Sequence, residues 1–271
     1  MAALTDIENR IHLDRVWKRD FDANRENAES VAQSIPILHV TSFESLLSVV
    51  LNQPLELVPS REGSEESART VRAEDALGLE RSLYFYSGRA FPGFGDVALA
   101  FEAGCEDDHT GSATPFDTGG LFAGHIKTNL PSNDPLVLRA FTQESLSDLG
   151  EWRDAFAVFL AAYFRKPADF WGARPCKADP DGVFKNPDNT WRAWTFEVRF
   201  YEGHNVCSRV AWAHSEAVVE RLTEMLIDEP PQGAFPTPLQ QFLEGKPSLS
   251  PQGNVDFCGE IERWTQREVG I

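Results

Sequence analysis

The sequence predicts an α+β protein with a mixed or antiparallel sheet, and two observations carry this prediction. Short apolar runs rich in aromatic and β-branched residues are bounded by polar turns, as is typical of strands. Longer stretches carry apolar residues at helical spacing and lie before, between and after these runs. The chain has 271 residues, of which 42% are hydrophobic, so it can bury a sizeable core as one large domain or two small ones.

The first expected element is an amphipathic helical stretch over residues 5–34, which opens with the capping-box pattern of Thr5 and Glu8. Pro36 ends this pattern. We therefore expect an N-terminal helical arm over residues 1–35. The arm either covers the body of the same domain, which the amphipathic pattern favours, or binds a partner.

The body of the chain is expected over residues 36–228. Its predicted strands are at residues 37–40, 82–86, 97–101, 191–200 and 206–213. Its predicted helices are at residues 43–50, 145–165 and 215–227, the last of them capped by Ser215. Polar surface loops are expected at residues 59–75, 102–112 and 167–189. The Pro- and Gly-rich residues 229–271 are expected to pack on the same body as an extension.

The chain is strongly acidic, with 42 Asp and Glu against 25 Lys and Arg and a formal net charge of −17. Such a chain repels polyanions unless its basic side chains gather in one cleft. The charge therefore disfavours a protein that coats nucleic acid. An enzyme that acts on one nucleotide is still compatible with it.

The sequence predicts neither export nor a membrane span. Its first thirty residues carry charges throughout and no apolar segment of the kind found in signal peptides. The longest apolar run, residues 155–164, is about half of the length that a bilayer requires. The cysteines lie far apart without a C-x-x-C pair, which indicates reduced thiols in a cytoplasmic protein and no metal site. They are Cys105, Cys176, Cys207 and Cys258.

Three separated pieces of the sequence carry candidate chemistry. The first is a histidine followed by a threonine at a strand-to-helix step. The second is an aromatic strand with an arginine after it, and the third is a glutamate in a late strand that follows a long loop. In chain order, the candidate residues are His39, Thr41, Tyr84, Tyr86, Arg89 and Glu197.

These residue types suit cleavage of the N-glycosidic bond of NAD. A carboxylate such as Glu197 can stabilise the positive charge that develops on the ribose, and it can take a proton from the nucleophile. Tyr84 and Tyr86 share a strand face, so one of them can stack on the cationic nicotinamide ring. His39 can hydrogen-bond the adenosine ribose, and Arg89 can neutralise the pyrophosphate.

In this order and spacing, the pieces resemble the ADP-ribosyltransferase superfamily, particularly its DarT-type toxins, over about residues 37–226. The resemblance implies a split mixed or antiparallel sheet flanked by helices, with residues 36–228 as the catalytic domain. It also implies NAD as co-substrate and transfer of ADP-ribose to a macromolecular target. A bacterial toxin or defence effector of this kind has an inhibitor or antitoxin protein as an expected partner.

The resemblance also assigns roles to the candidate residues. The catalytic residues that it implies are Glu197, Tyr86 and Arg89. The nucleotide-binding residues that it implies are His39, Thr41, Tyr84, Tyr86 and Arg89. Arginine-directed members carry a second Glu two residues before the catalytic one, where this chain has Thr195. The implied target is therefore not a guanidinium, and either a protein side chain or a single exposed nucleotide is expected.

Other interpretations of the same residues stay open. A histidine or tyrosine within a strand is commonly a packing residue, and Glu197 can be an exposed residue on the solvent face of its strand. The tripeptide at residues 117–119, beginning with Asp117, matches that of aspartic proteases. A single-chain protease of this class needs two copies, and a turn around Asp117 is the simpler explanation. A third interpretation is a catalytically inactive interaction module.

Overall fold

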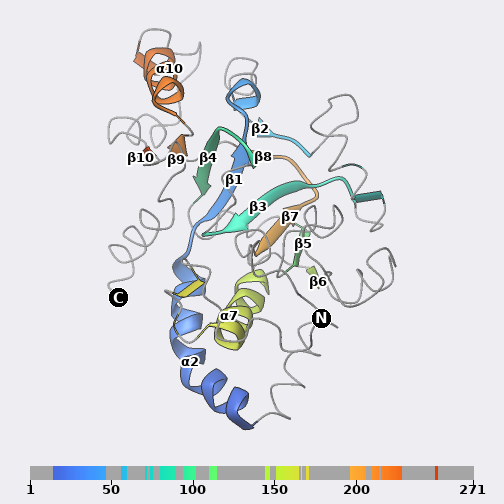
Figure 1. The fold of residues 1–271 in the computed structure, drawn as a ribbon. Helices are drawn as coiled ribbons and strands as arrows, with labels where there is room; N and C mark the ends of the chain where they lie inside the picture. The colour runs from blue at the N-terminus through green and yellow to red at the C-terminus, as the bar shows by residue number, and fades with distance from the viewer. Residues whose placement is uncertain are drawn as a thin grey trace.

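The computed structural model describes residues 15–46, 56–59, 71, 74–75, 80–88, 94–101, 110–114, 144–146, 151–164, 166, 169–170, 196–205, 209–213, 215–227 and 248–249. Within these residues the chain forms a sheet with helices near its two ends (Figure 1), so the prediction of an α+β protein with a mixed or antiparallel sheet is confirmed. The predictions on Arg89, Asp117, Thr195 and the four cysteines lie outside the described residues.

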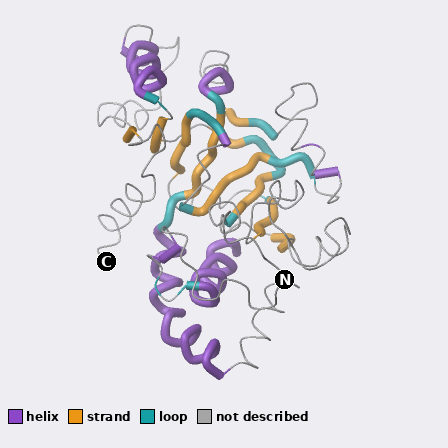
Figure 2. Tube along the Cα trace, in the orientation of Figure 1, coloured by secondary structure: helices purple, strands orange, loops and turns teal. Residues whose placement is uncertain are grey.

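The strands of the main sheet are β1 (Ile37–Thr41), β3 (Leu83–Ser87), β4 (Val97–Phe101), β5 (Gly111–Thr114), β6 (Glu144–Leu146), β7 (Glu197–Phe200), β9 (Arg209–Ala213) and β10 (Ser248–Leu249). Their order across the sheet is β10-β9-β4-β1-β3-β7-β5-β6. Figure 2 shows the strands in orange. Neighbouring strands pair antiparallel, apart from β10 and β9, which are parallel. A separate antiparallel pair joins β2 (Glu56–Leu57) to β8 (His204–Asn205).

Apolar composition predicted the central strands. β1, β3, β4, β7 and β9 coincide with runs that the sequence identified as strands, and residues 43–46 are helical as expected. Several assignments were wrong in part. Residues 169–170, expected in the surface loop at 167–189, are helical, and Phe170 is fully buried. Residues 111–112, expected in an acidic loop, begin β5, and residues 145–146, expected at the start of a helix, belong to β6. Both strands consist mainly of small or polar residues, so pairing within the sheet outweighs their weak local preference.

Helices α2 (Arg15–Ser34) and α7 (Glu151–Tyr163) pack against each other at one end of the sheet (Figure 1). Arg153 of α7 is buried and donates from Nη1 to the carbonyl oxygens of Ala32 and Ile35, at 2.5 and 3.0 Å. Carbonyls at a helix C-terminus lack partners within the helix, and a cation there also complements the helix dipole. The described part of the predicted arm therefore covers the body of the protein.

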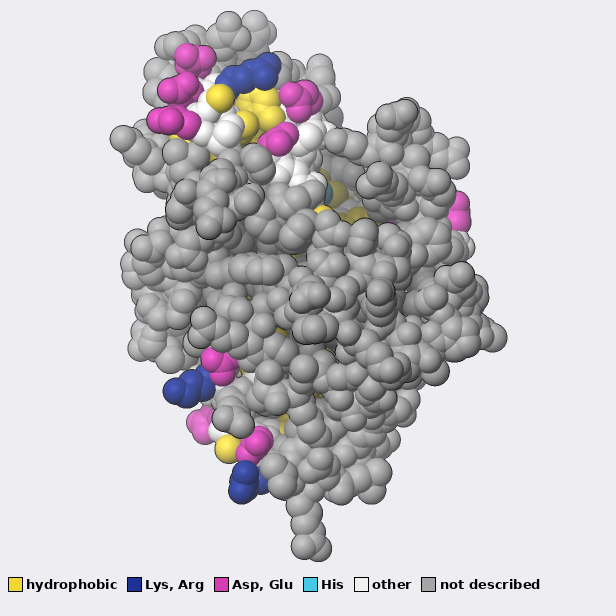
Figure 3. All heavy atoms as spheres, in the orientation of Figure 1, with side chains coloured by type: hydrophobic (Ala, Val, Ile, Leu, Met, Phe, Trp, Pro, Cys, Tyr) yellow, Lys and Arg dark blue, Asp and Glu magenta, His cyan; other side chains and the backbone are white. Residues whose placement is uncertain are grey.

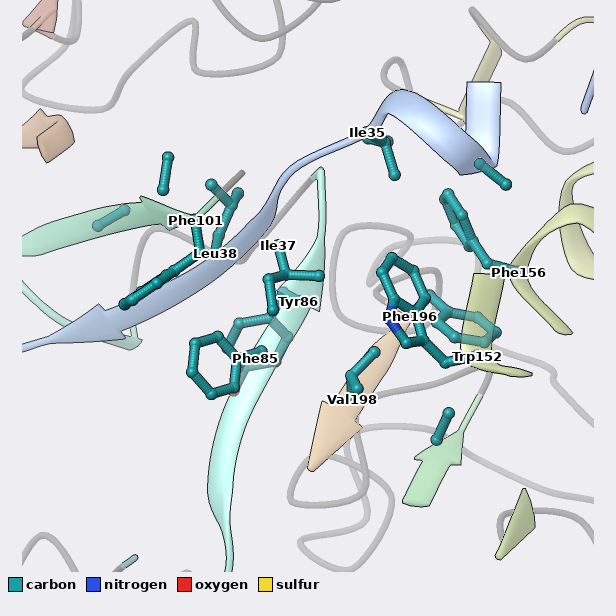
Figure 4. Packing of buried hydrophobic residues seen from close by; sticks show 14 of the residues in the cluster. Ile35, Ile37, Leu38, Phe85, Tyr86, Phe101, Trp152, Phe156, Phe196 and Val198 are labelled. Atoms are coloured by element: carbon teal, nitrogen blue, oxygen red, sulfur yellow. The ribbon is translucent and has the colours of Figure 1, made fainter. Parts of the chain in front are cut away.

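One part of the hydrophobic core lies where α7 meets the central strands. The ring of Phe196, next to β7, has its centroid 6.4 Å from that of Trp152 and 5.0 Å from that of Phe156. Figure 4 shows these rings next to Val198 of β7, with Phe85 of β3 on the far side of Val198. All five side chains are buried. One face of β7 thus packs into the core, and the alternate residues of the strand, Glu197 and Arg199, lie on the other face.

Helix α10 (Glu216–Ile227) lies at the opposite end of the sheet, where it contacts β9. Ser215 is its N-cap as predicted, since the Ser215 Oγ accepts a hydrogen bond from the Val218 backbone amide at 3.3 Å. Figure 3 shows charged side chains over α10 at one end and over α2 at the other. None of the helices in the described part of the chain combines the length and the apolar character needed to cross a membrane.

Candidate functional site

Glu197 is the first residue of β7, which lies between β3 and β5 in the sheet. In this register Glu197 pairs with Tyr86, whereas Arg199 pairs with Tyr84 on one side and with Ser112 on the other. Directly paired residues in antiparallel strands project from the same face of the sheet. These five residues therefore share one face, which we call the Glu197 face, in two adjacent rows.

Glu197 and Arg199 form a buried ion pair. Their side chains are 1% and 0% exposed, and Arg199 Nη1 donates to Glu197 Oε1 at 3.0 Å. Arg199 Nε donates to Ser112 Oγ at 2.9 Å. Buried charges are stable only when they are paired in this way. The interpretation of Glu197 as an exposed residue on a solvent face is therefore wrong, and its carboxylate is held on a central strand.

Glu74 brings a second buried carboxylate to Tyr84. The Tyr84 hydroxyl donates to Glu74 Oε1 at 3.0 Å, and the Ser82 backbone amide donates to the same oxygen at 3.0 Å. Arg81 Nη1 donates to Glu74 Oε2 at 3.1 Å. Burial raises the pKa of Glu74, while these three hydrogen bonds oppose that rise. Since Glu74 is fully buried, the prediction that residues 59–75 form a surface loop is wrong at this position.

Tyr84 is half-buried and keeps its phenol proton at neutral pH. Burial raises the pKa of its hydroxyl well above the usual value, and the negative charges of Glu197 and Glu74 raise it further. Tyr86, in the same row as Glu197, is 7% exposed and stacks on Phe94 with ring centroids 5.0 Å apart. Of the two tyrosines, Tyr84 therefore has the larger accessible surface.

His39 and Thr41 lie on the opposite face of the sheet from Glu197. In β1, Leu38 pairs with Tyr86 and so shares the Glu197 face, which puts its neighbour His39 on the other one. The His39 ring is 5.5 Å from that of Phe85, and its Nδ1 is 2.8 Å from the Tyr84 carbonyl oxygen. Because a carbonyl only accepts, His39 Nδ1 carries the proton of this hydrogen bond.

Burial lowers the pKa of His39 to about 4, with an opposing contribution from the hydrogen bond to the Tyr84 backbone. The imidazole is therefore neutral at physiological pH. These contacts are those of a packed histidine, which was one of the interpretations open from the sequence. Among the predicted residues, the structure thus brings Glu197, Tyr84 and Tyr86 together and separates His39 and Thr41 from them.

Three residues of this cluster had no predicted role. Arg199 stands two residues after Glu197, and an Arg at this spacing from a Glu in a strand lies on the same face and is itself a signal for an ion pair. Ser112 and Glu74 carry no comparable local signal. Ser112 reaches the cluster through the pairing of β5 with β7. Glu74 reaches it through hydrogen bonds with Ser82 and Tyr84, which are 8 and 10 residues further along the chain.

No group of three or more His, Cys, Asp or Glu residues within the described ranges could hold a metal ion. Comparison of the chain with protein-family models, with curated proteins and with solved structures found no match. The residues of the Glu197 face are therefore the basis for inferring a function.

Proposed function

We propose that the chain is an NAD-dependent ADP-ribosyltransferase that modifies a macromolecular target and that Glu197 is its catalytic carboxylate. The observation that carries this proposal is a buried, Arg-held carboxylate in one row with Tyr86 and one row from Tyr84. Glu197, Tyr84 and Tyr86 are also among the residues that carry the resemblance of the sequence to the ADP-ribosyltransferase superfamily. A split sheet and an active-site cleft of that superfamily's kind are part of the proposal.

In the proposed reaction, the bond between the ribose C1′ and the nicotinamide nitrogen breaks, and its electron pair leaves with nicotinamide. A nucleophile of the target forms the new bond to C1′ and gives up its proton. Glu197 stabilises the positive charge on the ribose and accepts that proton. Arg199 fixes the Glu197 carboxylate from one side through its 3.0 Å ion pair, so that no large rearrangement is needed as charge develops.

The aromatic contact to the nicotinamide is proposed for Tyr84. The ring of Tyr86 is already stacked on Phe94 and almost fully buried, whereas Tyr84 is half-buried. An aromatic face beside a cationic ring is favourable by about 0.5–2 kcal/mol. Arg89, three residues after Tyr86, is retained as the proposed partner of the pyrophosphate.

His39 and Thr41 lie on the wrong face of the sheet to contact the NAD that is bound at Glu197. A ligand that touches Glu197 and His39 at once would have to reach both faces of the sheet. His39 supports the backbone of β3 from the opposite face instead, through its hydrogen bond to Tyr84. We therefore assign His39 a structural part in holding Tyr84.

The target class follows from the charge and from the resemblance. With a net charge of −17, the chain is poorly suited to bind long polyanions, so a protein side chain or one exposed nucleotide is the proposed acceptor. A cytoplasmic toxin or defence effector, controlled by an inhibitor or antitoxin protein, is the corresponding biological role.

The experiment that tests this function is incubation of the protein with labelled NAD in a cell lysate. We expect label in a macromolecular fraction, either protein or nucleic acid, and a rise in the melting temperature of the protein with added NAD. Label that appears only in free ADP-ribose would indicate NAD hydrolysis without transfer. Unchanged NAD and unchanged melting at millimolar NAD would contradict the proposal and favour an interaction module.

A further inference from the structure

Glu74 acts as acceptor in its hydrogen bonds with three donors of residues 81–84. The donors are the Ser82 backbone amide, the Tyr84 hydroxyl and Arg81, at 3.0, 3.0 and 3.1 Å. Arg81 also bridges to Asp75 at 3.0 Å, so a cation lies between the two carboxylates. This arrangement satisfies the ionised form of a carboxylate that is fully buried.

The direction of the Tyr84 hydrogen bond has a consequence for recognition. A phenol has one proton, and here it is directed to Glu74 Oε1. To any further group, the Tyr84 oxygen can then offer only its lone pairs. A ligand group that contacts this oxygen must therefore be an N–H or O–H donor, and a carboxylate in the same place would be repelled.

We propose that Glu74 is a positioning residue, which fixes Tyr84 as a hydrogen-bond acceptor for the carboxamide N–H₂ of nicotinamide. This rests on the proposed function, in which Glu197 contacts the ribose to which nicotinamide is attached. Tyr84 stands one row from Glu197 on the same face, and the two rows are roughly 6.6 Å apart along the strand. A nicotinamide ring with its carboxamide is about long enough to span this separation. Arg199, the cation opposite Tyr84, already donates to Glu197 and Ser112.

The hydrogen-bonding state of Tyr84 can be measured without any ligand. The tyrosine doublet in the Raman spectrum distinguishes a phenol that donates from one that accepts, and subtraction of the Tyr84→Phe spectrum isolates Tyr84. We expect a donor-type signal in the wild type that is lost in Glu74→Ala and kept in Glu74→Gln, which retains an acceptor oxygen. Asp75→Asn is the matched control, since Asp75 contacts Arg81 and is 64% exposed. A Tyr84 signal unaffected by Glu74→Ala would overturn the assignment.

Selectivity between NAD and nicotinic acid adenine dinucleotide tests the proposed hydrogen bond from the nicotinamide carboxamide to Tyr84. The two differ in the carboxamide, which is a carboxylate in the second. We expect the wild type to prefer NAD, with this preference reduced by about tenfold in Glu74→Ala and in Tyr84→Phe and retained in Glu74→Gln. The two losses should not add in the double variant, because both remove one interaction.

The two measurements separate the possible failures. Equal binding of both dinucleotides by the wild type, with NAD transfer present, would refute the carboxamide contact and leave the proposed function standing. Binding of neither dinucleotide would refute the proposed function and with it the ligand part. A donor-type Tyr84 signal that depends on Glu74 would then still support the positioning role. If Glu74→Ala does not fold, Tyr84→Phe and Glu74→Gln decide the outcome.

Discussion

At the scale of single residues, His39 makes stability depend on pH. Its pKa is about 4 in the folded chain, against 6.5 for an unperturbed histidine. As the pH falls below 6.5, the unfolded chain takes up a proton that the folded chain does not. We therefore expect the free energy of unfolding to fall by up to about 1.4 kcal/mol per pH unit between pH 6.5 and 4 because of this residue.

Urea unfolding at pH 7 and pH 5 checks the His39 prediction. His39→Asn keeps an N–H donor near the Tyr84 carbonyl and removes the titrating group, so this variant should lose less stability between the two pH values than the wild type does. Equal losses in the two proteins would show that His39 is not the group responsible.

At the scale of elements, the turn before β4 depends on a close approach between two backbones. The Asp96 amide donates to the Thr41 carbonyl oxygen at 2.9 Å, and a Cβ on Gly95 would overlap with that same oxygen. The neighbouring Asp96 Oδ2 accepts from the Phe43 amide at 3.2 Å. The end of β1 is therefore tied to this turn, and only glycine fits at position 95.

We expect Gly95→Ala to lower the free energy of unfolding by about 1–3 kcal/mol, because the backbone must shift to relieve the overlap. Chemical denaturation measures this loss. A neutral or stabilising effect, as is seen when alanine replaces glycine in an open position, would contradict the close approach.

Sequence reasoning identified elements where local composition decides the conformation. The runs at β1, β3 and β4 are rich in apolar and aromatic residues, so they were recognised without knowledge of their partners. β5 and β6 read Gly-Ser-Ala-Thr and Glu-Ser-Leu and become strands through long-range pairing. In the candidate site, too, some contacts have a local sequence signal and others do not. The alternation of residues along a strand puts Glu197 and Arg199 on one face, but no local pattern indicates that Glu74 reaches Tyr84.

At the scale of the whole molecule, α2 is joined to the body through Arg153. Its guanidinium donates to two carbonyls at the end of α2 and lies 4.4 Å from the Trp152 ring centroid. We expect Arg153→Met to lower the free energy of unfolding by about 2–3 kcal/mol, since two charge-assisted hydrogen bonds are lost from a buried position. Hydrogen exchange in the last turn of α2 should accelerate as well.

Arg25→Gln is the matched control for Arg153→Met. Arg25 pairs with Glu29 within α2 and is partly exposed, so its loss should change stability by less than about 1 kcal/mol. Similar effects of the two substitutions would mean that α2 is not held to the body by Arg153.

Catalysis by Glu197 is tested most directly by the rate of ADP-ribose transfer from labelled NAD in Glu197→Gln. Because Glu197 is buried against Arg199, this variant loses stability as well as charge. Glu197→Gln combined with Arg199→Met removes both charges and separates folding from catalysis. We expect the transfer rate to fall by orders of magnitude in both Glu197 variants, even if the double variant is as stable as the wild type. Glu29→Gln on α2 is the control, and we expect it to keep the full transfer rate. Wild-type transfer rates in a stable Glu197→Gln/Arg199→Met protein would contradict the assignment of Glu197 as the catalytic carboxylate.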